Sequence, residues 1–177
     1  VWRVGRQMGR WPEYEVHRMK HQDFLSAAVS VLFSATAQEK PARVFKAGAA
    51  TSNITPPLGM EIVGNFAPRP IAAHVHDELH ARCLVLDDGG TKLAFVVADT
   101  ISLARDVWDE AKQKIEAATG IPRSNMMFSG THTHSSVSAL TNADPSLNYR
   151  QIIISRVVDG VRRAVNNLEP AKIAWGA

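Results

Sequence analysis

The sequence has 177 residues, of which 45% are hydrophobic and 21% are charged. These values are typical of one soluble domain with a sizeable core. The formal net charge is +3, but residues 1–37 carry five Lys/Arg against three Asp/Glu, and residues 38–177 carry 15 against 14. The larger part is near neutral and lacks a basic stripe with interleaved aromatic residues, which argues against nucleic acid as a partner. The single Cys83 excludes an internal disulfide and a cysteine-based zinc cage, and we expect it to be a small buried hydrophobe.

The first 37 residues are not expected to belong to the fold. Residues 1–18 begin with Val1 and show no hydrophobic period, so we interpret them as sequence upstream of the native start. Residues 19–37 place Lys20 and His21 before an apolar run and end in Ala-Thr-Ala, the order of a secretory signal peptide. The run is shorter than the roughly 20 apolar residues that span a bilayer, so no transmembrane segment is predicted. The alternative is an amphipathic N-terminal helix; with a signal peptide, residues 38–177 would be secreted or periplasmic.

Strand signals dominate the next part of the chain. Val44–Ser52 is rich in small residues and predicts a first strand, and the long proline-containing loop over residues 53–70 is of a kind that is often functional. Ala81–Leu86 and Leu93–Ala98 are apolar runs joined by Asp-Asp-Gly-Gly. This arrangement predicts a β-hairpin.

A helix is predicted after the hairpin, with Ser102 as its N-cap and Gly120 as its stop. Its apolar face is expected to contain Leu103, Val107, Ala111, Ile115 and Ala118. Met126–Phe128 then has the composition of a strand. The order strand, helix, strand predicts a parallel pair joined by a right-handed crossover.

A second, longer helix is predicted to start at Asp144-Pro145, with Asp as the cap and Pro in the first turn. Its expected apolar face, in which Arg156 and Gly160 are the only irregularities, comprises Tyr149, Ile152, Ile153, Arg156, Val157, Gly160, Val161, Ala164, Val165 and Leu168. Glu169-Pro170 ends the helix, and Lys172–Trp175 is predicted to begin another strand. The predicted fold class is α/β, a mixed sheet with a β-hairpin and strand-helix-strand crossovers and with helices packed on the sheet. The last strand makes us expect an incomplete domain.

The pair His132 and His134 follows the Met126–Phe128 strand after small residues. In an extended chain, residues two apart project to the same side, so the two imidazoles would share one space. Zinc binds imidazole nitrogen, but a catalytic zinc takes about three protein ligands and a water, so this pair alone is not a site. One alternative is two histidines hydrogen-bonded to loop backbone. Another is a zinc site within this chain, made by both histidines and one of His74 or His76.

Other candidate residues surround this pair in the predicted topology. Asp99 ends the strand before the first helix, and we expect it at the same sheet edge as His132, where ligands bind in open α/β sheets. Asp99 is either a residue at the start of the helix or a residue that orients a metal-binding histidine through a hydrogen bond to its imidazole ring. His74, His76 and His80 are interpreted as loop histidines, although Asp77 could orient a ring. Ser129 and Ser135 lack a G-x-S-x-G motif, which argues against a serine hydrolase.

Five spaced segments agree in order with one known pattern. They read A-G-A-A-T-S-N-I-T-P-P-L-G (47–59), H-D-E-L-H-A-R-C-L-V-L-D-D-G (76–89), A-x-x-G-I-P-R-x-N (117–125), S-G-T-H-T-H-S (129–135) and N-N-L-E-P-A-K-I (166–173). Over residues 46–177 the chain therefore resembles the N-terminal catalytic domain of the neutral/alkaline non-lysosomal ceramidases.

The resemblance implies a zinc-dependent amidohydrolase that cleaves the N-acyl bond of ceramide or a related lipid amide. It makes His132, the first histidine of T-H-T-H-S, a zinc ligand, and it implies that a second His, a Glu, a Tyr and the catalytic serine lie beyond Ala177. This chain would then hold one zinc ligand of four and be inactive alone. His134 is expected to bind the substrate or the water, with Asp99 and His76 in supporting or substrate-binding roles. A lipid substrate also implies peripheral contact with a membrane.

Two departures from the family pattern concern the substrate. Ser136 and Val137 stand where the best-known ceramidases have Gly-Pro, and the H-V-H-D segment (74–77) resembles a bacterial subgroup instead. These departures bear on ceramide as the substrate more than on amide hydrolysis at zinc. The alternative function is that of a secreted metal-binding or non-catalytic fragment of a hydrolase-like domain with another substrate.

Overall fold

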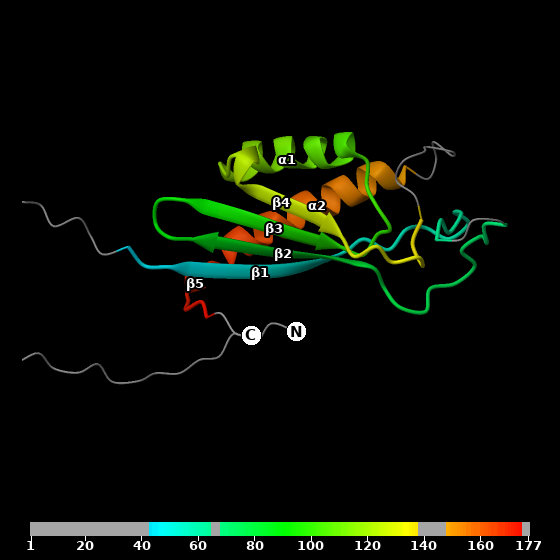
Figure 1. Ribbon diagram of the computed structural model, residues 1–177, viewed down its shortest axis with the longest axis horizontal. Helices are drawn as coiled ribbons and strands as arrows, with labels where there is room; N and C mark the ends of the chain where they lie inside the picture. Colours follow the sequence, from blue (N-terminus) through cyan, green and yellow to red (C-terminus); the bar gives the residue numbers. More distant parts are fainter. Residues whose placement is uncertain (1–42, 65–67, 138–147, 175–177) are drawn as a thin grey trace, which may run out of the picture. The chain divides into compact units, whose positions relative to one another are not determined.

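The computed structural model describes residues 43–64, 68–137 and 148–174. These residues form a five-stranded mixed sheet in the order β4-β3-β2-β1-β5, with two helices packed on one face (Figure 1). The α/β class, the hairpin and the packed helices are confirmed. The predicted signal peptide, the residues before it and the helix start at Asp144-Pro145 lie outside the described residues.

The centre of the sheet is an antiparallel unit of three strands, β1 (Lys46–Asn53), β2 (His80–Asp87) and β3 (Lys92–Ala98). The predicted hairpin joins β2 and β3, in register from Ala81 opposite Ala98 to Asp87 opposite Lys92. Asp88 closes its turn by accepting hydrogen bonds from the backbone N–H groups of Thr91 and Gly90, which lower the pKa of its carboxyl group. The Asp-Asp-Gly-Gly signal therefore identified the turn for a physical reason.

The first helix, α1 (Arg105–Thr119), connects β3 to β4 (Met126–Gly130), and a short 3-10 helix, η1 (Arg123–Asn125), precedes β4. The two strands pair in parallel, as predicted. The predicted N-cap Ser102 is wrong, because the helix starts after Ala104, which makes no side-chain cap. Gly120 does end the helix, in the left-handed conformation with a φ of 72°.

The second helix, α2 (Tyr149–Asn166), crosses β1 and β2, and it begins after Asn148, whose side chain accepts the N–H of Gln151. Its buried residues are Tyr149, Ile153, Ile154, Val157, Gly160, Val161 and Ala164. The predicted face was thus largely right, but Arg156 is exposed and Ile154 was missed. Gly160 permits close packing, since a Cβ there would lie 2.7 Å from Cys83 Sγ and 2.8 Å from Ser52 Oγ.

Cys83 lies in this contact between helix and sheet and is buried, as predicted. Burial raises the pKa of its thiol to about 12, which makes it an inert packing residue. On the opposite sheet face, the alternate residues of β3 and β4 include Val97 and Met127, which are exposed. The helices therefore cover one face only among the described residues.

The chain beyond α2 differs from the prediction. The last strand is β5 (Glu169–Pro170), two residues that pair with Lys46 and Ala47, whereas residues 172–174, predicted as strand, form none. The strand signal was wrong because Glu169-Pro170, taken as a helix stop, already pairs at the edge of β1. Within the described ranges, no helix is long and apolar enough to cross a membrane.

Candidate functional site

The ends of the parallel strands β3 and β4 lead directly into the candidate site. The backbone N–H of Thr131 donates to Ala98 O at 2.9 Å, and the N–H of His132 donates to Thr100 O at 3.0 Å. These two bonds continue the strand pairing beyond the last ladder pair, Ala98 and Gly130. The prediction that the chain segments carrying Asp99 and His132 meet at one sheet edge is confirmed.

Backbone geometry turns the chain sharply at His132. Its φ is 62°, and it is the one residue other than glycine with a positive φ in the described part of the chain. Gly130 makes the approach possible, because a Cβ there would lie 2.9 Å from Thr100 O. A left-handed non-glycine residue costs roughly 1–2 kcal/mol, so the surrounding contacts must hold it in place.

The imidazole of His132 is held by a backbone carbonyl. Its Nδ1 lies 2.8 Å from Ile101 O. A carbonyl oxygen can only accept, so Nδ1 carries the proton and, in the neutral ring, Nε2 keeps a free lone pair. Metal-binding histidines are commonly oriented in this way, through a hydrogen bond from the other ring nitrogen. The alternative of a histidine hydrogen-bonded to loop backbone is thus correct for Nδ1, while Nε2 remains available to bind a ligand.

His134 lies beside this ring but not in the way the sequence predicted. The strand ends at Gly130, and the positive φ of His132 breaks the extended conformation from which we expected parallel projection. The two rings nevertheless meet edge to face, with centroids 5.2 Å apart. Both residues are exposed, so ligands can reach the pair from solvent.

The loop after β1 forms a wall behind this pair. The N–H of Val63 donates to Ser136 O at 3.0 Å, and Ile62 forms a bridge with Val137. Gly64 touches the backbone of His134 so closely that a Cβ would lie 2.0 Å from His134 O. The long loop that the sequence marked as functional therefore fixes the position of the histidine segment.

Asp99 makes different contacts from those predicted. Its carboxylate accepts two hydrogen bonds from Arg82 Nη1, at 2.8 and 2.9 Å, and one from the backbone N–H of His80 at 3.0 Å. It therefore ties the start of β2, which carries His80 and Arg82, to the end of β3. Orienting an imidazole was one of the two roles considered for Asp99, but the tautomer of His132 is set by Ile101 O.

The other histidines are held loosely or by neighbouring acids. His76 Nδ1 lies 2.8 Å from Asp77 Oδ2, with both side chains 88% exposed, and His80 Nε2 lies 3.6 Å from Glu78. His74 is also exposed. Within residues 43–64, 68–137 and 148–174, no three His, Cys, Asp or Glu side chains are grouped to hold a metal ion. The alternative of a zinc site made by His132, His134 and His74 or His76 is therefore wrong for this part of the chain.

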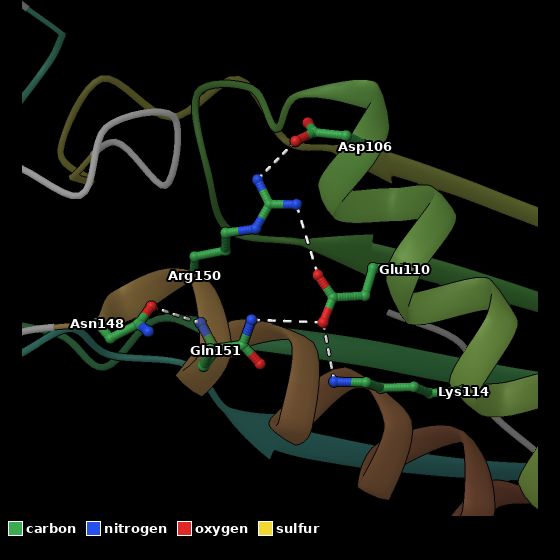
Figure 2. A network of polar contacts seen from close by, with 6 residues as sticks. All are labelled: Asp106, Glu110, Lys114, Asn148, Arg150 and Gln151. Atoms are coloured by element: carbon green, nitrogen blue, oxygen red, sulfur yellow. Dashed lines mark hydrogen bonds and ion pairs between the residues drawn. The ribbon is translucent and has the colours of Figure 1, made fainter. Parts of the chain in front are cut away.

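A polar network joins the starts of the two helices that follow the site segments (Figure 2). Arg150 of α2 reaches Asp106 at 2.6 Å and Glu110 at 3.5 Å, both on α1. Glu110 also accepts from Lys114 at 2.8 Å and Gln151 at 3.3 Å. The bond from Arg150 lowers the pKa of Asp106, and the bond from Lys114 is the main cause that lowers the pKa of Glu110. The network thereby joins the first turns of α1 to the first turn of α2.

Three residues that support the site were missed as such by sequence reasoning, namely Gly64, Ile101 and Ser136. Ile101 acts through its backbone carbonyl, which any residue carries, so no sequence signal could identify it. Gly64 stood in the loop already marked as functional, and Ser136 stood out as a departure from the family pattern. The sequence therefore drew attention to Gly64 and Ser136 but did not indicate which residues they contact.

Comparison with known proteins assigns the chain to a family. The model of the family described as "Neutral/alkaline non-lysosomal ceramidase, N-terminal" matches residues 45–177, well over half of the sequence. The chain belongs to this ceramidase family. The match spans both the loop after β1 and the His132 segment, so the predicted resemblance is confirmed.

Solved structures agree in fold. The chain is similar to neutral ceramidase from Pseudomonas aeruginosa, with a TM-score of 0.59 and 23% identity over 72% of this chain and 22% of that chain. A structure described as ceramidase complexed with C2 gives a TM-score of 0.58, with the same identity and coverage. The chain thus spans about a fifth of the length of these solved proteins.

Proposed function

We propose that the protein containing this chain hydrolyses the N-acyl bond of ceramide or a related lipid amide, with zinc as its cofactor. Family membership supports the reaction class. The observation that carries the proposal to particular atoms is the hydrogen bond from His132 Nδ1 to Ile101 O, which leaves Nε2 free to bind a metal. Because the chain spans about a fifth of its solved relatives, the complete activity is assigned to the whole protein.

The donor set fits one ligand of a zinc site. An imidazole with its Nδ1–H bonded to a carbonyl is a suitable zinc ligand, and His132 is solvent-accessible at a strand end. When bound, zinc supplies a Lewis acid that polarises the amide carbonyl and lowers the pKa of a water from about 15.7 toward about 7. The remaining ligands are proposed to come from residues after Ala177, because the chain spans about a fifth of its solved relatives.

The neighbouring residues have narrower proposed roles. His134 is proposed to bind the substrate or the attacking water, and this role is supported by the 5.2 Å distance between its ring centroid and that of His132. Asp99 positions the segment carrying Ile101 by tying the start of β2 to the end of β3. His76 is proposed to contact substrate from the loop before β2. In the overall reaction, water adds to the amide, the C–N bond breaks, and a fatty acid and an amine leave.

Replacement of His132 tests the proposal. Asn accepts the left-handed backbone more readily than most residues, so His132→Asn in the full-length protein removes the imidazole with little change to the loop. We expect loss of bound zinc by elemental analysis and at least a hundredfold loss of ceramide hydrolysis, measured with a labelled ceramide. His74→Asn, in an exposed loop, is the matched control and should keep both. Full activity and a full zinc complement in His132→Asn would overturn the assignment.

We also propose that the protein acts outside the cytoplasm and touches membranes at their surface. Residues 19–37 have the order of a signal peptide, and a ceramide-like substrate resides in membranes. Fractionation of expressing cells tests this proposal, and activity confined to the cytoplasm would contradict it.

A further inference from the structure

Ser136 is buried in the loop that carries His132, although the sequence around it is polar. Its exposed fraction is 1%, and that of Thr100, across the strand end, is 0%. A buried hydroxyl is stable only when it is hydrogen-bonded. The Oγ of Ser136 accepts the N–H of Ile101 at 3.0 Å and donates to Thr133 O at 3.4 Å. Both of these hydrogen bonds of the hydroxyl group are therefore made to residues of the candidate site.

The bond to Ile101 is one of three hydrogen bonds that join the residues Thr100 and Ile101 to His132 and Ser136. The peptide group between Thr100 and Ile101 accepts the N–H of His132 at its carbonyl end, at 3.0 Å, and donates to Ser136 at its N–H end. The next carbonyl, Ile101 O, accepts from the ring of His132. The imidazole and the hydroxyl thus hold the two sides of one residue, Ile101.

We propose that Ser136 is a positioning residue for His132 that acts through Ile101. By accepting the Ile101 N–H, its hydroxyl fixes the turn that presents Ile101 O to the imidazole. That carbonyl keeps the proton on Nδ1 and directs the Nε2 lone pair outward. The inference rests on the proposed function for its link to zinc, but the positioning itself is a property of the metal-free chain.

The backbone of Ser136 strengthens this role. Ser136 O accepts the N–H of Val63, so the residue is fixed from the loop after β1 while its side chain reaches the β3 end.

Substitution with a matched neighbour tests the proposal. Ser136→Ala removes the acceptor, and Ser135→Ala is the control because its side chain is exposed on the same loop. In full-length protein with isotope-labelled histidine, NMR of the metal-free form above the usual histidine pKa of about 6.5 reports which ring nitrogen carries the proton. We expect His132 to lose its Nδ1–H preference in Ser136→Ala only. Zinc affinity should fall about 10–100-fold in the same variant, the usual effect of losing such a support.

Two further measurements keep the test decisive. If Ser136→Ala does not fold, Ser136→Thr, which keeps the hydroxyl, should retain the tautomer. In the unchanged protein, the Ile101 amide should exchange slowly with solvent. A rapidly exchanging Ile101 amide, or an unchanged His132 tautomer and zinc affinity in Ser136→Ala, would overturn the proposal. Loss of the zinc role of His132 alone would sink the proposed function but leave the tautomer result standing.

Discussion

The chain contains two His-x-His pairs, and their surroundings differ sharply. The pair His74 and His76 lies in an exposed loop, where the His76 ring bonds only to its sequence neighbour Asp77 within the described part of the chain. The pair His132 and His134 lies at the joined ends of β3 and β4, where Ile101 O holds one ring. Because the two pairs have the same spacing in the sequence, the spacing alone does not predict which histidine ring is held in place.

Long-range backbone contacts make the difference. His132 is fixed by residues 31 positions earlier in the chain, whereas the His76 contact is one position away. An exposed side chain held only by its neighbour keeps most of its rotamer freedom and must lose it on binding. A ring held by a carbonyl has already lost that freedom, and therefore offers a preorganised ligand.

The largest expected effect comes from disturbing the contact between the loop after β1 and the segment that carries His132 and His134. In Gly64→Ala the new Cβ would lie 2.0 Å from His134 O, so the loop must move. Overpacking of this kind costs about 1–3 kcal/mol, and we expect a lower melting temperature together with a zinc affinity reduced about 10–100-fold. Calorimetry and zinc titration of the full-length protein measure both.

Gly59→Ala is the control for this change. Its Cβ would meet no atom within 4 Å, but its φ is +90°, so it strains the backbone without touching the histidines. It should lower stability and leave zinc affinity unchanged. Equal loss of zinc affinity in both variants would mean that the loop contact with His134 is unimportant.

An intermediate effect is expected when each pair loses its second histidine. His134→Ala should keep zinc but lower the rate of lipid-amide hydrolysis about 10–100-fold, because a group next to the ligand is removed. His76→Ala should lower it less, since His76 must first be ordered. Steady-state kinetics with one labelled ceramide compares the two. A larger loss in His76→Ala would contradict the distinction drawn between the pairs.

The smallest effect concerns the network that joins the starts of the two helices. Arg150→Gln removes the bond that lowers the pKa of Asp106 from its usual 3.8. A carboxyl group with a lowered pKa stabilises the fold above its unfolded pKa, and this contribution is lost as the pH falls through the folded pKa. The variant should therefore melt slightly earlier at neutral pH, and the difference should begin to shrink as the pH falls below about 4 and vanish only below the lowered pKa of Asp106.

Arg123→Gln is the matched control for the helix network. It removes an exposed ion pair with Glu116, at 3.0 Å, from the other end of α1. Exposed pairs contribute little, so its effect at neutral pH should be no larger than that of Arg150→Gln. If the Arg150→Gln difference persisted unchanged at acid pH, the ion pairs would not be its cause.

The elements that sequence reasoning predicted well are those governed by local rules. The β2–β3 hairpin followed from its turn residues, and the end of α1 followed from Gly120, whose left-handed conformation suits glycine. The buried face of α2 followed from helical spacing. Each of these signals lies within a few residues of the structure that it specifies.

The parts that failed depend on contacts between distant segments. The extended conformation expected through His134 gave way at His132, because bonds to Thr100 and Ile101 impose another backbone. Asp99 was expected to face an imidazole, but Arg82 on the neighbouring strand takes its carboxylate. The family resemblance predicted His132 as a metal ligand, yet only the packed structure shows which of its ring nitrogens is free.

The continuation of strand pairing past Ala98 and Gly130 has an evolutionary consequence. The backbone of His132 is held by peptide groups, which every amino acid supplies, whereas the Ser136 side chain holds the residue whose carbonyl faces its ring. Exposed side chains on the same loop, such as Ser135, can therefore diversify between lineages, and change the preference for acyl chains or head groups, without moving the imidazole.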